Sequence, residues 1–205
     1  MRLTNIVWTT AIIAAAIILT AVLSTATLQA EPEAEARKAA AGGSATPGKA
    51  DQIRRGKYLV DIMGCHDCHT PMKLGPNGPE WDMTRALSGH PEQLAMPAAP
   101  VQQLPWLASM AMTMTAWSGP WGTSFTRNLT PDKETGLGDW TVEEFIATMK
   151  TGRERGKGRP VLPPMPVEVV SKLTDTDIRA LFAYLQTVKP IKNRIPQPID
   201  PPDSK

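Results

Sequence analysis

The hydrophobic pattern begins with one long apolar run and only later changes to the spacing of amphipathic helices. Residues 6–28 contain no charged side chain, and a helix of this length would span about 34 Å, compared with about 30 Å for the hydrocarbon core of a bilayer. This run predicts a transmembrane helix within residues 1–30. Leu28-Gln29-Ala30 would also fit a signal-peptide cleavage site, but signal peptides usually have an apolar stretch of only about 7–15 residues, so we favour a retained anchor.

The residues that follow the apolar run lack large hydrophobic side chains. Residues 31–50 are small, polar and glycine-containing, which is typical of a flexible linker. Arg2 precedes the run, and positive charge remains on the cytoplasmic side of a membrane. We therefore expect a folded domain over residues 51–205 that faces the periplasm from a bacterial inner membrane.

Three later stretches carry apolar residues at helical spacing, so we predict an all-α domain. The first begins near Asp51, which is placed to cap it, and ends at Gly64. The second opens with the capping-box sequence Thr141-Val142-Glu143-Glu144. The third follows Thr174, and we expect it to cross the first. Its apolar residues at i, i+3, i+4 and i+7 form one face: Ile178, Leu181, Phe182 and Leu185.

Residues 81–125 interrupt the helical pattern with a mixture of Met, Pro and Trp. The stretch is too apolar for a free loop and too broken for a long helix, so we predict an insertion in the helical domain. Met110, Met112 and Met114 alternate as on a strand, which would place three thioethers on one face. They would form either a Cu(I) site or, as we favour, an adaptable surface that packs internally or faces a partner.

The chemistry of the chain is concentrated in the hexapeptide Gly64-Cys65-His66-Asp67-Cys68-His69, which contains both cysteines. Cys-x-x-Cys-His is the spacing that attaches a c-type haem: the two thiols add to the vinyl groups of the porphyrin and the histidine binds the iron. The formal net charge of only +2 gives no indication of nucleic acid as a partner. We predict one covalently bound haem c.

Three other readings of the two cysteines are weaker. A thioredoxin-like dithiol needs a βαβ context that the flanking sequence lacks, and a structural disulfide across so short a loop would stabilise little. A zinc site needs four ligands, and only His90 and scattered acids remain to complete it. With His69 as proximal ligand, we expect a backbone carbonyl within residues 75–79 to accept its second ring N–H.

Val161-Leu162-Pro163-Pro164-Met165-Pro166 predicts the distal ligand. The Fe–S bond is weak and needs a stiff segment, and the three prolines restrict the backbone and preclude helix there. We therefore predict Met165 as the sixth ligand and Pro164 as a residue of the haem pocket. His90 is the alternative ligand, which would give bis-histidine ligation.

Two polar stretches have two readings each. Asn128 and Thr130 lie in a polar turn that either contacts the haem propionates or forms an ordinary loop. A basic run is either a solvated face or a surface that steers an acidic redox partner toward the haem edge; it consists of Arg153, Arg155, Lys157 and Arg159.

The domain resembles single-haem class I cytochromes c, and most of all the cytochrome modules of bacterial membrane-bound dehydrogenases. The resemblance implies Cys65 and Cys68 as thioether attachment points, His69 as proximal ligand and Met165 as distal ligand. The stretch from Trp81 to Trp121 departs from the family pattern. The matching stretches are RRGKYLV, GCHDCHTP, NLTPDKETGLGDWTVEEF, LPPMP and LTDTDIRALFAYLQTVKP.

We therefore expect a membrane-anchored cytochrome c that relays single electrons between redox protein partners and is not itself an enzyme. With His69 and Met165 both bound, the iron would have no position for a substrate. The first alternative is a haem c subunit built permanently into a larger membrane oxidoreductase or respiratory complex. The second is a haem enzyme or gas sensor whose iron is five-coordinate because Met165 does not bind it.

Overall fold

The computed structural model of the chain describes residues 48–100 and 102–201. The predicted anchor in residues 1–30, and nearly all of the predicted linker in residues 31–50, lie outside the described residues. Within the described ranges, no helix combines the length and the apolar character that a membrane span requires.

Helices α2, Lys49–Ile62, and α6, Asp175–Leu185, form the predicted crossing pair. They meet at Gly56, where an added Cβ would overlap the carbonyl oxygen of Ala180, so glycine permits the close approach of the two backbones. Asp51 is not a cap as expected: α2 starts two residues earlier, after Gly48, and Asp51 lies in its first turn.

The second predicted helix is α4, Val142–Thr151, and its capping box is present. The Thr141 hydroxyl accepts the Glu144 backbone N–H at 3.1 Å, while the Glu144 carboxylate accepts the Thr141 N–H at 3.0 Å. The remaining helical pieces are short: α3, Cys65–His69; α5, Val167–Val170; and the 3₁₀ turns η1, Met83–Arg85, and η2, Glu154–Gly156.

One apolar core lies between these helices. Phe145 of α4 and Phe182 of α6 pack with ring centroids 5.3 Å apart, and Cys65 of α3 contacts the edge of the same core. Burial of such side chains is the main stabilising contribution to the domain. Its fully enclosed members are Leu59, Val60, Leu87, Leu137, Phe145, Ile178, Leu181 and Leu185.

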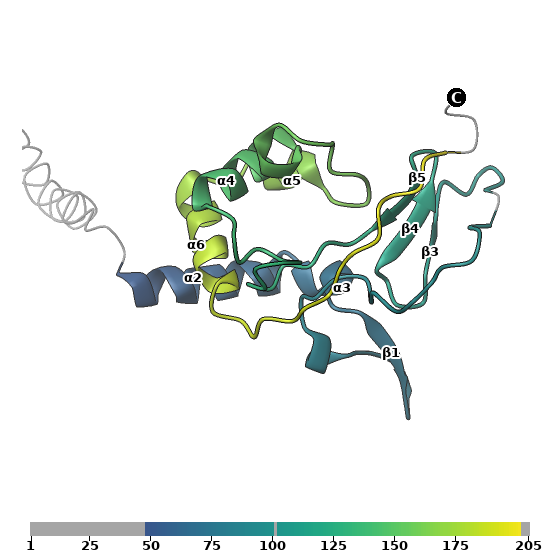
Figure 1. Cartoon of the computed structure of the whole chain (residues 1–205), viewed down its shortest axis with the longest axis horizontal. Coiled ribbons are helices and arrows are strands. Elements are labelled where there is room, and N and C mark those ends of the chain that lie inside the picture. Colours follow the sequence, from purple (N-terminus) through teal and green to yellow (C-terminus); the bar gives the residue numbers. More distant parts are fainter. Residues whose placement is uncertain (1–47, 101, 202–205) are drawn as a thin grey trace, which may run out of the picture. The chain divides into compact units, whose positions relative to one another are not determined.

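The prediction of an all-α domain is wrong, because the described residues also contain two antiparallel sheets (Figure 1). The first is a hairpin of β1, Met72–Gly75, and β2, Gly78–Trp81. The second has the order β3-β4-β5, from Ser109–Met110, Ala116–Gly119 and Gly122–Phe125. Two-residue turns between glycines close the β1–β2 and β4–β5 hairpins, and such turns favour antiparallel pairing over helix.

The three alternating methionines do not share a strand face. Only Met110 belongs to β3, Met112 is exposed in the following turn, and Met114 has a left-handed backbone with φ of 57°. A positive φ in a non-glycine residue is a turn conformation that breaks the alternation of a strand. The prediction of three thioethers on one face is therefore wrong.

The chain after α6 runs back across the domain to the second sheet (Figure 1). Ile199 and Thr123 of β5 exchange two backbone hydrogen bonds, at 2.8 and 2.9 Å. On the way, the buried Asn193 amide donates to the carbonyls of Ser88 and His90 at 2.7 and 2.8 Å. The C-terminal segment thus holds the sheet against the rest of the domain.

Candidate haem site

The hexapeptide forms helix α3 directly after the end of α2. Gly64 connects the two helices in a left-handed conformation, with φ of 66°, which glycine adopts without strain. Cys65 and Cys68 then lie one helical turn apart, and His69 ends the helix. The two thiols are not joined by a disulfide, so both remain able to form thioether bonds.

His69 has one ring nitrogen occupied. Its Nδ1 lies 2.8 Å from the Arg127 carbonyl oxygen, and because a carbonyl only accepts, Nδ1 carries the proton and Nε2 keeps its lone pair. Burial lowers the pKa of His69, which favours this neutral form. The acceptor predicted within residues 75–79 is therefore wrong, although the kind of interaction is the expected one.

The two cysteines do not have the environment of an exchanging dithiol. Burial raises the pKa of Cys65 to about 11 and also raises the pKa of Cys68. Reactive Cys-x-x-Cys pairs have lowered pKa values, because the thiolate is the nucleophile. Over residues 48–100 and 102–201, no cluster of three or more His, Cys, Asp or Glu side chains is arranged to hold a metal ion, so the zinc reading gains no support.

His90 has no ring nitrogen left for iron. It is fully buried against Phe125; Nε2 donates to the Leu94 carbonyl and Nδ1 accepts from the Thr115 hydroxyl, both at 3.0 Å. The structure therefore gives His90 a role in packing the insertion and argues against the bis-histidine alternative.

Met165 lies half-buried in the proline-rich segment that leads into α5. With Val161, Pro163 and Val167 it lines an apolar cleft of about 410 Å³. The segment is fastened at its start, where the Val161 N–H donates to the Gly152 carbonyl at 2.8 Å. Pro164 is half-buried next to Met165 and is not among the residues that line this cleft, so its place in a haem pocket stays a prediction.

The polar atoms of Asn128 are occupied by the protein itself. Its Nδ2 donates to the Ile191 carbonyl at 2.8 Å, and its Oδ1 accepts the backbone N–H and the hydroxyl of Thr130 at 3.0 and 2.8 Å. Asn128 is buried and so holds the C-terminal segment against the 128–135 turn. Of the two readings, the structure favours an internal role in the loop.

Two of the four cations in the basic run, Arg155 and Arg159, pair with carboxylates of the protein itself. Arg155 bonds the carboxylates of Glu144 and Asp139, and Arg159 pairs with Glu154 at 3.1 Å. The Glu154 carboxylate also forms an ion pair with the Arg127 guanidinium, at 2.9 Å. Arg153 and Lys157 are exposed and form no ion pair among the described residues, so the run is partly an ion-pair network and partly a solvated face.

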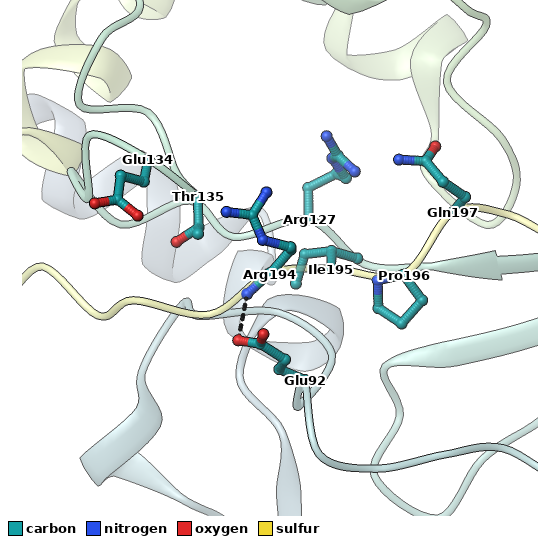
Figure 2. A pocket seen from close by; sticks show the side chains of 8 residues that line it. All are labelled: Glu92, Arg127, Glu134, Thr135, Arg194, Ile195, Pro196 and Gln197. Carbon is teal, nitrogen blue, oxygen red and sulfur yellow. Dashed lines mark hydrogen bonds between the residues drawn. The ribbon is translucent and has the colours of Figure 1, made fainter.

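A second cleft of about 400 Å³ lies beside Arg127 and the C-terminal segment, and Figure 2 shows the side chains that line it. Arg127 and Arg194 both reach toward it, while the Arg194 backbone N–H donates to the Glu92 carboxylate at 3.0 Å. Next to Arg127, the Thr126 hydroxyl is buried without a partner among the described residues. Sequence reasoning did not identify either group, although Arg127 directly precedes the Asn128 turn.

These residues fit a covalent c-type haem. The site offers two thiols one turn apart, a neutral imidazole with a free Nε2, and a thioether on a proline-rich segment. The combination defines the class of c-type cytochromes. Comparison with known sequences agrees: the chain matches the cytochrome c family over residues 53–189 and belongs to it.

Three relatives share this family. The cytochrome c subunit of alcohol dehydrogenase (quinone) from Gluconobacter oxydans is 30% identical over 147 residues, which are 70% of this chain and 23% of the relative. The fructose dehydrogenase cytochrome subunit from Gluconobacter japonicus is 37% identical over 40% of this chain and 18% of its own length. The gluconate 2-dehydrogenase cytochrome c subunit from Pantoea cypripedii is 26% identical over 64% of this chain and 22% of its own length.

The chain spans less than a quarter of the length of these relatives. Membership of the family makes residues 53–189 a cytochrome c domain, which carries electrons on a covalently bound haem c. The expected resemblance to cytochrome modules of bacterial dehydrogenases is confirmed. When bound, the haem supplies an iron that accepts and releases one electron.

Proposed function

We propose that this protein is a permanently bound haem c subunit of a membrane dehydrogenase complex and passes single electrons from the catalytic subunit to an acceptor. Cys65 and Cys68 hold the porphyrin, His69 binds the iron through Nε2, and Met165 is the distal ligand. The relatives support the proposal because each bears the name of a cytochrome subunit of a dehydrogenase. Their substrates differ, so the substrate of the complex is left open.

The insertion carries the observation that favours a subunit over a shuttling carrier. Residues 93–126 contain no Asp, Glu, Lys, Arg or His, although much of the stretch is exposed. We call its exposed large side chains the insertion surface: Leu104, 95% exposed, and Trp106, Leu107, Met110 and Met112, each more than half exposed.

The composition of the insertion surface matches the core of a stable protein interface. Such cores are depleted of charge and enriched in Trp and Met, and exposed apolar patches in soluble domains mark interaction sites. A segment that lies on lipid would instead carry Lys or Arg along a polar face, which residues 93–126 lack. We therefore assign the insertion surface to the catalytic subunit of the dehydrogenase.

Extraction and sizing of the full-length protein from its native membranes would test the proposal. We expect haem absorbance to elute with dye-reducing dehydrogenase activity, at a mass well above the 22.2 kDa of this chain. In the double variant Trp106→Ser, Leu107→Ser, haem should elute apart from that activity. Leu74→Ser is the matched control, because Leu74 is also exposed and apolar, at 72%, but lies on β1. Elution of the wild-type haem protein alone would refute a permanent subunit.

The ligand set has its own test. The wild-type ferric protein should show the far-red charge-transfer band of a thioether on iron, and Met165→Ala should abolish it. The reduced wild-type protein should not bind carbon monoxide, since both axial positions are filled. Carbon monoxide binding to the wild-type protein would instead favour the five-coordinate enzyme or sensor.

The membrane position is also proposed. It is supported by the charge-free run of residues 6–28 and by Arg2 before it, which together would place the haem domain in the periplasm. Protease added to spheroplasts should cleave the haem domain while the membrane remains intact. Protection from protease until the cells are lysed would contradict this orientation.

A further inference from the structure

The segment that carries Met165 has few hydrogen bonds of its own. Prolines at positions 160, 163, 164 and 166 have no N–H to donate. Within the segment the Met165 N–H reaches the Leu162 carbonyl only at 3.3 Å. A ligand on such a segment needs an external contact to keep its place, because the bond from iron to a thioether is weak.

That contact comes from the insertion. The Ser124 hydroxyl of β5 donates to the Pro163 carbonyl at 2.6 Å, whereas its other neighbour, the Trp117 carbonyl, is 3.4 Å away. A hydroxyl has one proton, so the shorter contact takes it. Among the hydrogen bonds of the described residues, this one alone links residues 162–165 to another part of the chain.

Ser124 is itself held firmly. It is buried, and in the β4–β5 ladder it stands opposite Trp117. On one side the neighbouring Thr123 pairs with Ile199, and on the other the Thr126 N–H donates to the Thr115 carbonyl at 2.9 Å. The donor is therefore fixed relative to the sheet before it meets the distal segment.

The same strand end also reaches the proximal side. Three residues after Ser124, the carbonyl of Arg127 accepts the ring N–H of His69. The segment 124–127 thus contacts the distal ligand segment with a side chain and the proximal ligand with its backbone. One short stretch of chain therefore contacts both of the segments that carry the expected axial ligands.

We propose that Ser124 is a positioning residue for the distal thioether: its hydrogen bond to the Pro163 carbonyl holds Met165 on the iron. The inference rests on the ligand set of the proposed function, with His69 and Met165 as axial pair. It gives the insertion a second role, next to the haem, in addition to the surface that it presents to a partner.

The test uses the full-length haem-loaded protein and imidazole as a competing ligand for ferric iron. Ser124→Ala should bind imidazole about five- to tenfold faster, because losing one hydrogen bond changes the opening of the segment by that order. The far-red thioether band should weaken and the reduction potential should fall. Ser124→Thr, which keeps the hydroxyl, should restore the band and the slow rate.

Thr123→Val is the matched control. It removes the neighbouring hydroxyl on the same strand, which contacts Ser118 at 3.2 Å rather than the distal segment, and it should leave band and rate unchanged. If Ser124→Ala does not accumulate, Ser124→Cys replaces it, because a thiol of similar shape is only a weak donor.

A wild-type rate and a full band in the Ser124 variant would overturn the role of Ser124 while leaving the axial pair intact. Equal acceleration in Thr123→Val would also overturn it, since the effect would then come from the strand as a whole. A wild-type protein without the thioether band would overturn the axial pair, and the positioning role with it.

Discussion

The helical part and the insertion are stabilised in different ways. The helices bury a large apolar core, and charged pairs such as Arg55 with Asp177, at 2.8 Å, join them at the surface. The insertion has a much smaller core of Ala116, Phe125 and Ile195, surrounded by buried hydroxyls and His90. The large apolar side chains of the insertion surface, within residues 104–112, are exposed instead. The helices thus complete their own core, while the insertion keeps apolar surface for a contact outside the described chain.

Gly56→Val should give the largest effect, because it separates the helices without touching the insertion. A side chain at Gly56 would overlap the Ala180 carbonyl of α6, and overpacking of this kind costs about 3 kcal/mol or more. Chemical denaturation, followed by helical circular dichroism, would measure the loss. Gly48→Ala is the control: its added Cβ would meet nothing closer than 3.5 Å. Equal stability of the two variants would contradict the close crossing of α2 and α6.

Asn193→Ala should have the next largest effect, because it acts where the two regions meet. The Asn193 side chain donates to the Ser88 and His90 carbonyls and accepts from Arg85 and from the backbone of Glu92. Leaving such buried groups unpaired costs roughly 2–3 kcal/mol in free energy of unfolding. Thermal unfolding would show it, with the exposed Gln93→Ala as control. If Asn193→Ala lost no more stability than Gln93→Ala, the helical part and the insertion would be held together by other contacts.

Thr141→Ala should cost less, about 1 kcal/mol, because it removes one half of the capping box at the start of α4. The effect should be confined to the helical part. Thr176→Ala, an exposed threonine within α6, should change the stability by less than about 0.5 kcal/mol. Denaturant titration would measure the free energy of unfolding of both variants. A similar loss in the two would show that the cap is not needed once the helix is packed.

His90 should change the pH dependence rather than the stability at neutral pH. Burial lowers the pKa of His90 below its ordinary value of 6.5. As the pH falls through 6.5, His90 takes up a proton in the unfolded chain but stays neutral in the folded protein. The free energy of unfolding therefore falls as the solution is acidified. Unfolding measured from about pH 7 to about pH 5 should therefore show a shallower decline for His90→Gln. An unchanged slope would mean that His90 titrates normally in the fold.

Local patterns predicted the helical part well. The capping box at Thr141, the cap at Thr174 and the hexapeptide after Gly64 all depend on residues within one or two turns of each other. Such short-range interactions can be read from spacing alone. The β1–β2 hairpin was also within reach, because its two turn residues, Pro76 and Asn77, are both residues that favour turns, but the glycine and proline cluster indicated only turns.

Contacts between distant residues were out of reach. The acceptor for His69 is 58 residues away, at Arg127, and not in the nearby glycine-rich stretch. Ser124 and Pro163, 39 residues apart, gave no pattern that would pair them. The methionine triplet misled for another reason: a period of two over five residues does not distinguish a strand from a turn.

The position of Asn193 in the chain has a consequence for biosynthesis. The ribosome adds this residue 105 positions after Ser88, a delay of about 5–20 s at common rates of translation. Until then the loop that follows the hexapeptide lacks the amide that fastens it. The Ser88 and His90 carbonyls therefore stay without their Asn193 partner during an interval that is set by the sequence distance between the two contacts.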